Sequence, residues 1–551
     1  MTRTLLPGAV STPSSEFPRA ARREAAPRRV AWMLLAAAGL LGVLVPLALA
    51  TTTGGLAIPH NDAWSYSRIA QTFGNNGHIE LLGWNRSALF GQFLVLGPLA
   101  RWVIAQHVFV ALLGVVTLAA VHDLLVDTVG RVRAALAVLI VATWPGFGLL
   151  ATSFMLDVPA MAAMMVCLAL GRRALRNGST VLLAVSITFG LWGFTIREQA
   201  LAAPAAVLLI AAATAWRSRR IRDWSVVIVT SAMFLVTATV FELWRRSYAA
   251  GDPPVLAVPE SLVQVGGNAL VDGYFVLALV SAPAVLLVAR PWRWGCGALV
   301  ASAAAAVVAV VAVSNGSAED FFVGNYLDPA GPYRAAGNGR PAEIFPASAW
   351  WVVVALACVS GVLLAGVLAR RLRRVDPVLG TFGALIVLGN LGTALTGQEL
   401  FDRYWLLALP PLLAVVLAER TARSPNPSEH PSFARIAVRL PAVAALAALA
   451  GVSLVITAAG LAYDSARWDA AERMVAMGVP AVDVNSGLEW NGYHSGVGMS
   501  PPGSWKFPGS RSCYRVTASQ RPGQEAEMVW SYRPLVVAGA AQLWVYRDGC
   551  R

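Results

Sequence analysis

The chain has 551 residues, of which 57% are hydrophobic and only 13% are charged. A soluble globular protein carries about 25% charged residues, so this composition excludes a soluble enzyme, a disordered chain and a coiled coil. The net charge is +13. Almost all of the positive side chains are arginines, which fall in short clusters between apolar runs. This pattern is typical of a polytopic membrane protein. It argues against a nucleic-acid partner, which needs positive charge gathered on one face.

The apolar runs predict the membrane-spanning helices, because a helix needs roughly 20 apolar residues to cross a bilayer. About thirteen spans are expected, at 30–50, 102–122, 134–150, 158–171, 180–196, 200–216, 224–243, 273–290, 295–314, 347–369, 377–396, 404–419 and 440–461. The arginine-rich tail at 1–29 is expected in the cytoplasm. It does not read as a signal peptide, since its charged region is long and no small-residue cleavage site follows the apolar stretch.

The arginine clusters give a test of this topology in a plasma (inner) membrane, because cytoplasmic loops carry an excess of positive charge. With alternating spans, every predicted inner loop is basic. These loops hold Arg131/Arg133, Arg172/Arg173/Arg176, Arg217/Arg219/Arg220/Arg222, Arg290/Arg293, Arg370/Arg371/Arg373/Arg374 and Arg420/Arg423/Arg435/Arg439. The outer loops are mostly poor in arginine, with Arg245/Arg246 the clearest exception.

Three segments are expected outside the cytoplasm. The loop at 51–87 contains an amphipathic stretch, NDAWSYSRIAQTF, which predicts a helix at the membrane surface, and the loop at 315–346 is rich in Gly and Pro. The remainder, 462–551, is called the tail domain here. It opens with a helical pattern and continues with β-like runs at AVDVNS, CYRVTAS, EMVWSY and QLWVYR. The sequence therefore predicts a helical membrane domain at 30–461 followed by a small extracytoplasmic α/β domain.

Cysteine usage is consistent with that placement. Cys513 and Cys550 both lie in the tail domain, and a disulfide between them would persist in an oxidising compartment. Two cysteines in one domain can also stay unpaired. Cys167, Cys296 and Cys358 fall in apolar spans, where a thiol usually packs as a small core residue. No CxxC pair or HExxH helix appears, so a structural zinc site is not expected.

Two aspartates are candidates for chemistry, because an ionisable side chain at a span boundary is costly to desolvate. Asp62 precedes the surface helix in HNDAWSYSR, and Asp157 stands at the mouth of the fourth span in MLDVPA. Each also has a structural interpretation. Asp62 could cap its helix by accepting bonds from first-turn amides, and its position alone does not separate this role from catalysis. Asp157, two residues before Pro159, could mark a helix start.

Arginines on the arginine-poor side are candidates for binding an anion. Arg197 and Glu198 occupy the outer turn in FTIREQ, and Asp402 with Arg403 repeats the pairing before the twelfth span. Adjacent opposite charges can form a simple interfacial pair, but phosphate is a natural partner for such an arginine. His78 and Glu80 have metal-ligand spacing, although two ligands make a weak signal for a divalent metal. These charges predict an outer cavity fed laterally from the lipid.

Taken in order, four motifs resemble those of the GT-C membrane glycosyltransferases, in particular the dolichyl-phosphate-mannose protein mannosyltransferase and aminoarabinose transferase group. HNDAWSYSRIAQTFGNNG follows the first span, and MLDVPAMAAMMVCLAL looks like that family's Met-Leu-Asp-x-Pro start of the fourth span. GLWGFTIREQALAAPAA and RYWLLALPPLLAVVLA match a basic turn and a late Arg-Tyr segment. DAAERMVAMGVPAVDVNSGLEWNG is similar to the extracellular appendage of related bacterial members.

The resemblance implies a GT-C-like catalytic domain that moves a sugar from a polyprenyl-phosphate donor, with inversion, to a cell-envelope glycan, lipid or protein. It makes Asp62 the general base, lets Asp157 line the site, and gives Arg197 to the donor phosphate, with Arg403 a weaker second candidate. The family usually has Lys at the position of Arg197 and Asp-Glu in place of Asn61-Asp62. The second difference leaves room for Glu80 or a divalent metal. No cofactor is otherwise implied.

Other classes remain open at this level. A secondary transporter or a flippase for lipid-linked sugars could also have about a dozen spans, although the sequence shows no internal repeat and its charges sit at the rim. A non-catalytic assembly factor could use the tail domain as a binding module. Trp64, Tyr66 and Trp84 could stack on a sugar, but aromatic residues are expected at membrane interfaces anyway. Neither the sugar nor the acceptor is identified by the sequence.

Overall fold

A computed structural model provides the fold. It describes residues 17–82, 90–219, 221–247, 261–315, 324–329, 331–332, 344–418, 440–499, 506–536 and 539–550, with side chains from residue 28 onward except at 222 and 223. Trp84, the Arg420 to Arg439 cluster and most of the 315–346 loop lie outside these residues. Within the described ranges the structure is a bundle of apolar helices with a small sheet after it.

The bundle helices follow one another along the chain. In the first half of the chain they are α1 (Phe17–Gly39), α2 (Val45–Thr53), α3 (Ala63–Asn76), α4 (Phe90–Leu96), α5 (Val103–Val129), α6 (Arg131–Ala142), α7 (Phe147–Ala151), α8 (Asp157–Asn177), α9 (Thr180–Phe194) and α10 (Ala202–Ser218). In the second half they are α11 (Ile221–Ser247), α12 (Leu262–Val288), α13 (Cys296–Ser314), α14 (Ala347–Arg371), α15 (Pro377–Leu395), α16 (Leu409–Leu417) and α18 (Leu440–Ala476).

Ten helical stretches among the described residues are long and apolar enough to cross a membrane. Several of them expose their apolar side chains. On α11, for example, Leu235, Val236 and Leu243 are all more than 60% exposed. A soluble protein rarely presents apolar surface of this extent, whereas a bilayer solvates it. The helical, polytopic membrane architecture is therefore the arrangement that these helices fit.

Three of the thirteen predicted spans form shorter helices than expected. α9 has 15 residues, α6 has 12 and is followed by the separate short α7, and α16 has only nine. A short 3-10 helix, Asp402–Ala408, precedes α16, and Pro410 and Pro411 follow it at the start of α16. A continuous apolar run in the sequence does not predict such a break, because its hydropathy is the same whether the helix is continuous or interrupted.

Several arginines of the predicted inner loops lie together at one end of the bundle, which is called the basic end here. Arg172 Nε donates to Asp376 Oδ2 at 3.0 Å, and Arg133 Nη1 donates to the Leu417 carbonyl at 3.1 Å. Arg371 donates to the neighbouring Val416 carbonyl. These bonds join the ends of α8, α14 and α16 to the starts of α6 and α15, so the basic loops meet at one end.

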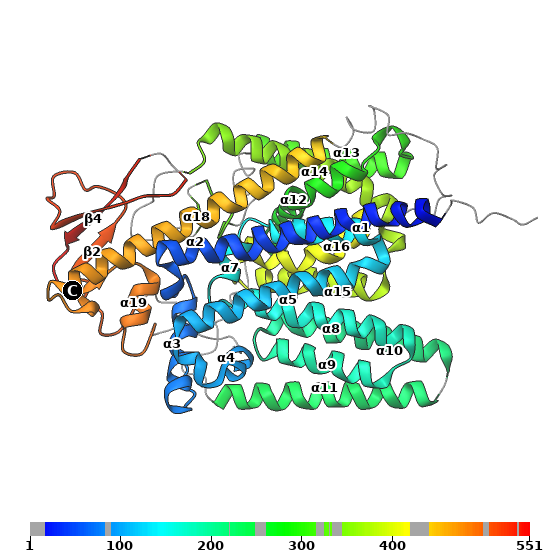
Figure 1. Cartoon of the computed structure of the whole chain (residues 1–551), viewed down its shortest axis with the longest axis horizontal. Coiled ribbons are helices and arrows are strands. Elements are labelled where there is room, and N and C mark those ends of the chain that lie inside the picture. Colours follow the sequence, from blue (N-terminus) through cyan, green and yellow to red (C-terminus); the bar gives the residue numbers. More distant parts are fainter. Residues whose placement is uncertain are drawn as a thin grey trace, which may run out of the picture.

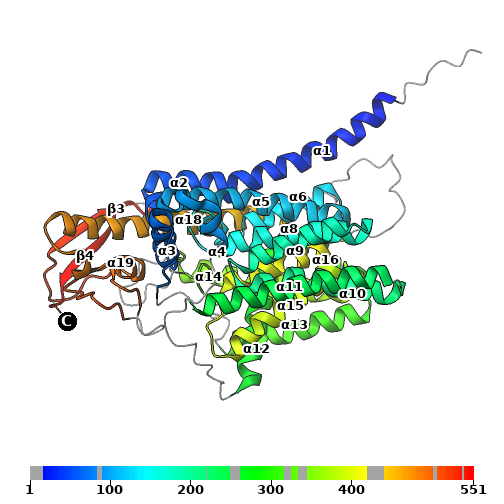
Figure 2. The ribbon, with the colours of Figure 1, turned by 90° about the horizontal axis from the view of Figure 1, so that it is seen from below.

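The tail domain lies at the opposite end of the bundle from the start of α1 (Figures 1 and 2). Its first element corrects the predicted boundary at 461/462. α18 is one unbroken helix of 37 residues, about 55 Å long at 1.5 Å per residue, which exceeds the roughly 30 Å of hydrocarbon in a bilayer. The last span and the first helix of the tail domain are therefore a single rod (Figure 1).

All four predicted β-like runs form strands. They are β1 (Val484–Asn485), β2 (Tyr514–Thr517), β3 (Met528–Tyr532) and β4 (Ala541–Arg547), and a short helix, α19 (Leu488–His494), follows β1. The sheet order is β1-β2-β4-β3, with β1 and β2 parallel and the other pairs antiparallel. The sheet packs on the end of α18 through Trp468, Trp490, Val516, Leu543 and Val545.

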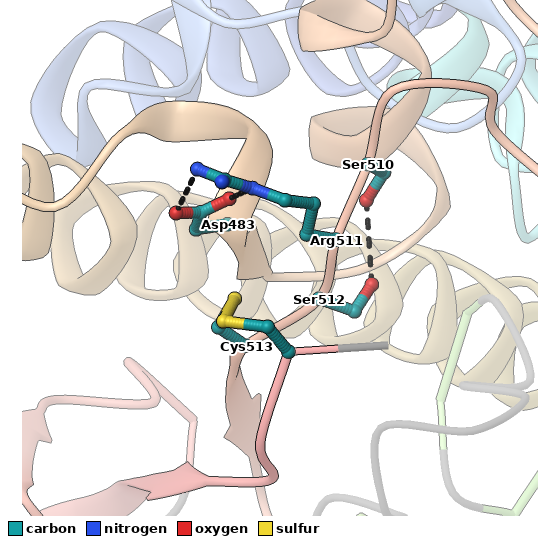
Figure 3. The surroundings of a disulfide bond; sticks show 6 residues. Asp483, Ser510, Arg511, Ser512 and Cys513 are labelled. Atoms are coloured by element: carbon teal, nitrogen blue, oxygen red, sulfur yellow. Dashed lines mark hydrogen bonds and ion pairs between the residues drawn. A yellow bond between two sulfur atoms is a disulfide. The ribbon is translucent and has the colours of Figure 1, made fainter.

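The predicted disulfide between Cys513 and Cys550 is confirmed. It joins the start of β2 to the residues after β4, which pair antiparallel in the sheet. Next to it, Arg511 makes a two-pronged ion pair with Asp483, with Nε and Nη2 at 2.5 and 2.6 Å from the two carboxylate oxygens (Figure 3). The ion pair therefore ties the segment before β1 to the segment before β2, and the disulfide ties β2 to the end of β4.

Candidate functional site

Asp62 stands immediately before α3, in a tight turn. The amides of Ala63, Trp64 and Ser65 donate to the backbone carbonyls of His60, Asn61 and Asp62, and Asn61 has a positive φ of 50°. The Asp62 side chain accepts no capping bond from the helix. The capping interpretation is therefore not supported. The carboxylate instead meets Arg403, whose Nη2 lies 3.1 Å from Asp62 Oδ2.

Asp157 is the first residue of α8, as the following proline predicts, and it is buried. Its carboxylate pairs with the guanidinium of Arg197, which is only 12% exposed. The same Oδ1 lies 4.0 Å from Arg403 Nε. Asp157 therefore contacts both arginines, although Arg197 and Arg403 come from different parts of the chain.

The two arginines are held by aromatic rings as well as by carboxylates. Arg197 follows α9 with extended backbone, and its guanidinium lies 4.7 Å from the centre of the Tyr404 ring. Arg403 lies 5.2 and 5.6 Å from the rings of Phe401 and Tyr404. Such cation–π contacts are stronger when the cation is desolvated. Tyr404 thus keeps the two like charges side by side.

Asp402 fixes the segment that carries Arg403. It is fully buried, and its carboxylate accepts from the amides of Tyr326, Leu327 and Arg403 at 2.7–2.9 Å. Burial raises the pKa of Asp402 to about 6, against the opposing effect of these donors and of Arg403. The carboxylate therefore anchors residues 326–327 to the start of the 3-10 helix, beside the paired charges.

The electrostatics keep the arginines charged. Burial by itself lowers the pKa of Arg403, but Asp157, Tyr404 and Asp62 outweigh burial and raise that pKa above its usual value. The pKa of Arg197 is raised in the same way, chiefly by Asp157. Two cations and two carboxylates form a neutral buried group. This group of four (Asp62, Asp157, Arg197 and Arg403) is called the charge cluster.

A small cavity adjoins the charge cluster. It is lined by Asp157, Arg197 and Arg403 together with Ala160, Met164, Leu406 and Leu407, and it encloses about 10 Å³, roughly the space of one water molecule. Arg403 Nε and Nη1 are buried and have no hydrogen-bond partner among the described residues. An unmatched guanidinium donor in a low-dielectric pocket favours an anion, and phosphate matches its planar geometry.

The other predicted site residues lie elsewhere. Glu198 points to Arg245, with a 3.6 Å ion pair, and does not line the cavity. His78 and Glu80 are exposed beyond the end of α3. Within the described ranges, no group of three or more His, Cys, Asp or Glu side chains is arranged to hold a metal ion. Neither Glu198 nor Glu80 lines the cavity, and the substrate-binding roles expected for them stay predictions.

The expected sugar-stacking aromatics differ among themselves. Trp64 is fully buried and packs against Gly492 and Phe507 of the tail domain, so it does not face the cavity. Tyr66 is one helical turn after Asp62, and its pKa is raised by burial and by the Asp62 charge. Tyr404 is the neighbour of the charge cluster that had no role predicted from the sequence, and its position directly after Arg403 was the available signal.

The charge cluster joins four segments at helix ends: the turn before α3, the start of α8, the turn after α9 and the 3-10 helix before α16. No protein-family model matches the chain, and no curated protein matches it by sequence. The function is therefore argued from this site.

Proposed function

We propose that the protein is a membrane glycosyltransferase of GT-C type that transfers a sugar from a polyprenyl-phosphate donor to an acceptor in the cell envelope. One observation carries the proposal: buried Arg403, with unmatched donors, lies between two carboxylates beside a second buried arginine. The arrangement supplies phosphate-binding cations and a nearby base. Its position at helix ends, away from the basic end, suits an extracytoplasmic acceptor and a donor that arrives from the lipid.

In the proposed reaction, the acceptor hydroxyl oxygen attacks the anomeric carbon of the donor. The new C–O bond forms as the bond from that carbon to the phosphate oxygen breaks, which inverts the configuration. Asp62 takes the hydroxyl proton, because a carboxylate within reach can act as general base. The released polyprenyl phosphate gains negative charge, which Arg197 and Arg403 stabilise.

The free site has its arginines neutralised by aspartates, and its cavity is too small for a sugar phosphate. Donor binding would therefore exchange ion pairs: phosphate replaces a carboxylate at the arginines and frees Asp62 to accept a proton. The exchange keeps the buried charges paired, which avoids the high cost of an isolated buried ion. It also ties the activation of Asp62 to the presence of the donor.

The test is transfer from a radiolabelled polyprenyl-phosphate sugar by the purified protein, with the products separated into lipid and acceptor fractions. Arg403→Gln should reduce donor binding and transfer by a factor on the order of 10²–10³, the usual effect of losing one such charge-stabilising donor. Arg246→Gln is the matched control, since Arg246 is 72% exposed and pairs with Glu242 on the same helix.

Three outcomes separate the function classes. Transfer of label that depends on Arg403 supports the glycosyltransferase. Movement of intact labelled lipid across a vesicle membrane, with no bond cleavage, would instead identify a transporter or flippase. If the protein retains its thermal transition but shows neither activity, the proposal is contradicted and an assembly factor is favoured.

A further inference from the structure

A second buried network lies next to the charge cluster. His60, two residues before Asp62, is 1% exposed and is enclosed by two elements from opposite ends of the sequence. Its Nδ1 lies 2.9 Å from Asp464 Oδ2 on α18, and its Nε2 lies 2.7 Å from the Gly55 carbonyl oxygen after α2. The stretch that carries Asp62 is thus attached to the rod that enters the tail domain.

We propose that His60 is a positioning residue, a doubly protonated imidazolium through which the tail domain holds Asp62 in place for catalysis. The inference rests on the proposed function for its kinetic consequence. Its structural content, the charge state of His60 and its link to α18, stands independently.

The protonation state follows from the two contacts of the ring. A backbone carbonyl only accepts, so Nε2 must carry a proton. Asp464 also accepts from Arg467 Nη2 at 2.6 Å through its other oxygen, which favours the ionised carboxylate. An ionised carboxylate only accepts, so Nδ1 carries a proton as well. Both ring nitrogens are therefore donors.

Neighbouring charges stabilise the doubly protonated ring of His60 in its buried position. Arg467 also pairs with Glu489 at the start of α19 and donates from Nη1 to the Ser486 carbonyl at 2.9 Å. His60, Asp464, Arg467 and Glu489 form a buried set of two basic and two acidic side chains, each at most 7% exposed, in which burial raises the pKa of Glu489. His107 of α5 stacks on His60, with ring centroids 6.0 Å apart. With Asp464 and Glu489 both ionised by their contacts with Arg467, a neutral His60 would leave two anions facing one cation.

The link reaches Asp62 through the backbone. The His60 carbonyl accepts from the Ala63 amide at 3.0 Å, so His60 itself closes the first turn of α3, with Asp62 inside that turn. The tail domain also contacts α3 further along the helix. Arg68 Nη1 donates to the carbonyls of Gly492 and Ser495 at 2.9 and 2.8 Å. The tail domain therefore contacts both the His60 ring, before Asp62, and α3, after Asp62.

The test begins with the wild-type protein in detergent, labelled with ¹⁵N at histidine. One buried histidine should show both ring nitrogens protonated at neutral pH, and this signal should be absent from His60→Gln. A neutral tautomer at His60 would overturn the inference whatever the protein does to sugars. His78→Gln, which changes an exposed histidine of the same loop, is the matched control and should leave the signal in place.

The kinetic arm uses the transfer assay. His60→Gln and Asp464→Asn should each lower kcat by a factor on the order of 10², the usual effect of a small misplacement of a reacting group. Donor KM should stay nearly constant, because Arg197 and Arg403 are untouched. The double variant should be no worse than either single one. A loss confined to KM, or additive losses, would contradict the positioning role.

Hydrogen exchange distinguishes failure of the positioning role of His60 from failure of the proposed function. Faster exchange at the amides of residues 63–65 in both variants, with the tail-domain amides unchanged, supports the link even if wild type transfers no sugar. Unchanged exchange at 63–65 would overturn it even in an active transferase.

Discussion

Asp62 has two interpretations, a helix cap and a catalytic group, and its contacts decide between them. It occupies the capping position of α3, yet backbone carbonyls satisfy the first amides and the carboxylate faces Arg403. A side chain that supplies no capping bond contributes little to helix stability. Its place in an ion pair with Arg403 is better explained by the proposed role beside arginines that would bind a phosphate.

We therefore expect Asp62→Asn and Asp62→Ala to behave alike in transfer, each losing a factor on the order of 10²–10⁴, the usual contribution of a positioned acid–base group. A residue that capped the helix would behave differently, with Asn neutral and Ala costing about 0.5–2 kcal/mol. Transfer rates and thermal melting of both variants make the comparison. Near-normal transfer by Asp62→Asn would remove Asp62 from the mechanism.

At the scale of elements, α3 is the piece whose environment differs most from expectation. The sequence predicts an amphipathic helix at the membrane surface, but in the structure α3 is covered by the tail domain. Trp64 lies so close to Gly492 that a Cβ there would come within 2.4 Å of the indole ring. Tyr493 donates from its hydroxyl to Gln71 Oε1 at 3.0 Å.

Gly492→Ala should therefore destabilise the contact between α3 and α19 by about 1–3 kcal/mol, the usual cost of overpacking. The readout is the thermal midpoint of the purified protein together with hydrogen exchange along α3. Gly496→Ala is the control from the same segment, since a Cβ there meets nothing within 4 Å. Equal behaviour of the two variants would show that the contact is looser than described.

α19 should also respond to acid. Burial lowers the pKa of His494 from 6.5 to about 4, with Arg68 adding to the effect. The unfolded segment would take up a proton first as the pH falls, so the stabilisation is complete above about 6.5 and is lost progressively towards 4. Hydrogen exchange at residues 488–494 should accelerate over this range. His494→Phe should remove the dependence, and a variant that keeps it would assign the effect to another group.

At the scale of the whole molecule, the two ends of the bundle differ in chemistry. The basic end collects arginines from separate turns, while the charge cluster and the tail domain occupy other helix ends. Cytoplasmic loops carry the excess of Lys and Arg in membrane proteins. This asymmetry supports an orientation with the basic end in the cytoplasm and the tail domain outside it.

Reporter fusions test the orientation directly. A fusion to the C-terminus should behave as exported, and one placed after Gly178, in the basic turn between α8 and α9, should behave as cytoplasmic. The two fusions serve as controls for each other, because they sit at opposite ends of the same bundle. A cytoplasmic C-terminus would reverse the orientation and would remove the extracytoplasmic acceptor from the proposed function.

Much of the architecture could be read from local pattern. Apolar runs located the membrane-length helices, alternation located the four strands, and two cysteines in one domain indicated the disulfide. The breaks at α6 and α16 and the continuity of α18 could not be read in this way. Hydropathy measures how apolar a stretch is, and it is unaffected by where a helix is interrupted or continued.

The amino-acid sequence by itself determined which side chains are costly to bury, and so which residues were candidates: Asp62, Asp157, Arg197 and Arg403. Only the tertiary structure decided that Asp62 meets Arg403 across 341 residues and that His60 meets Asp464 across 404. It also separated Glu198 and Glu80 from that group. The physical reason is that burial cost is a property of single residues, whereas the partner that offsets the cost depends on how helices distant in the chain pack together.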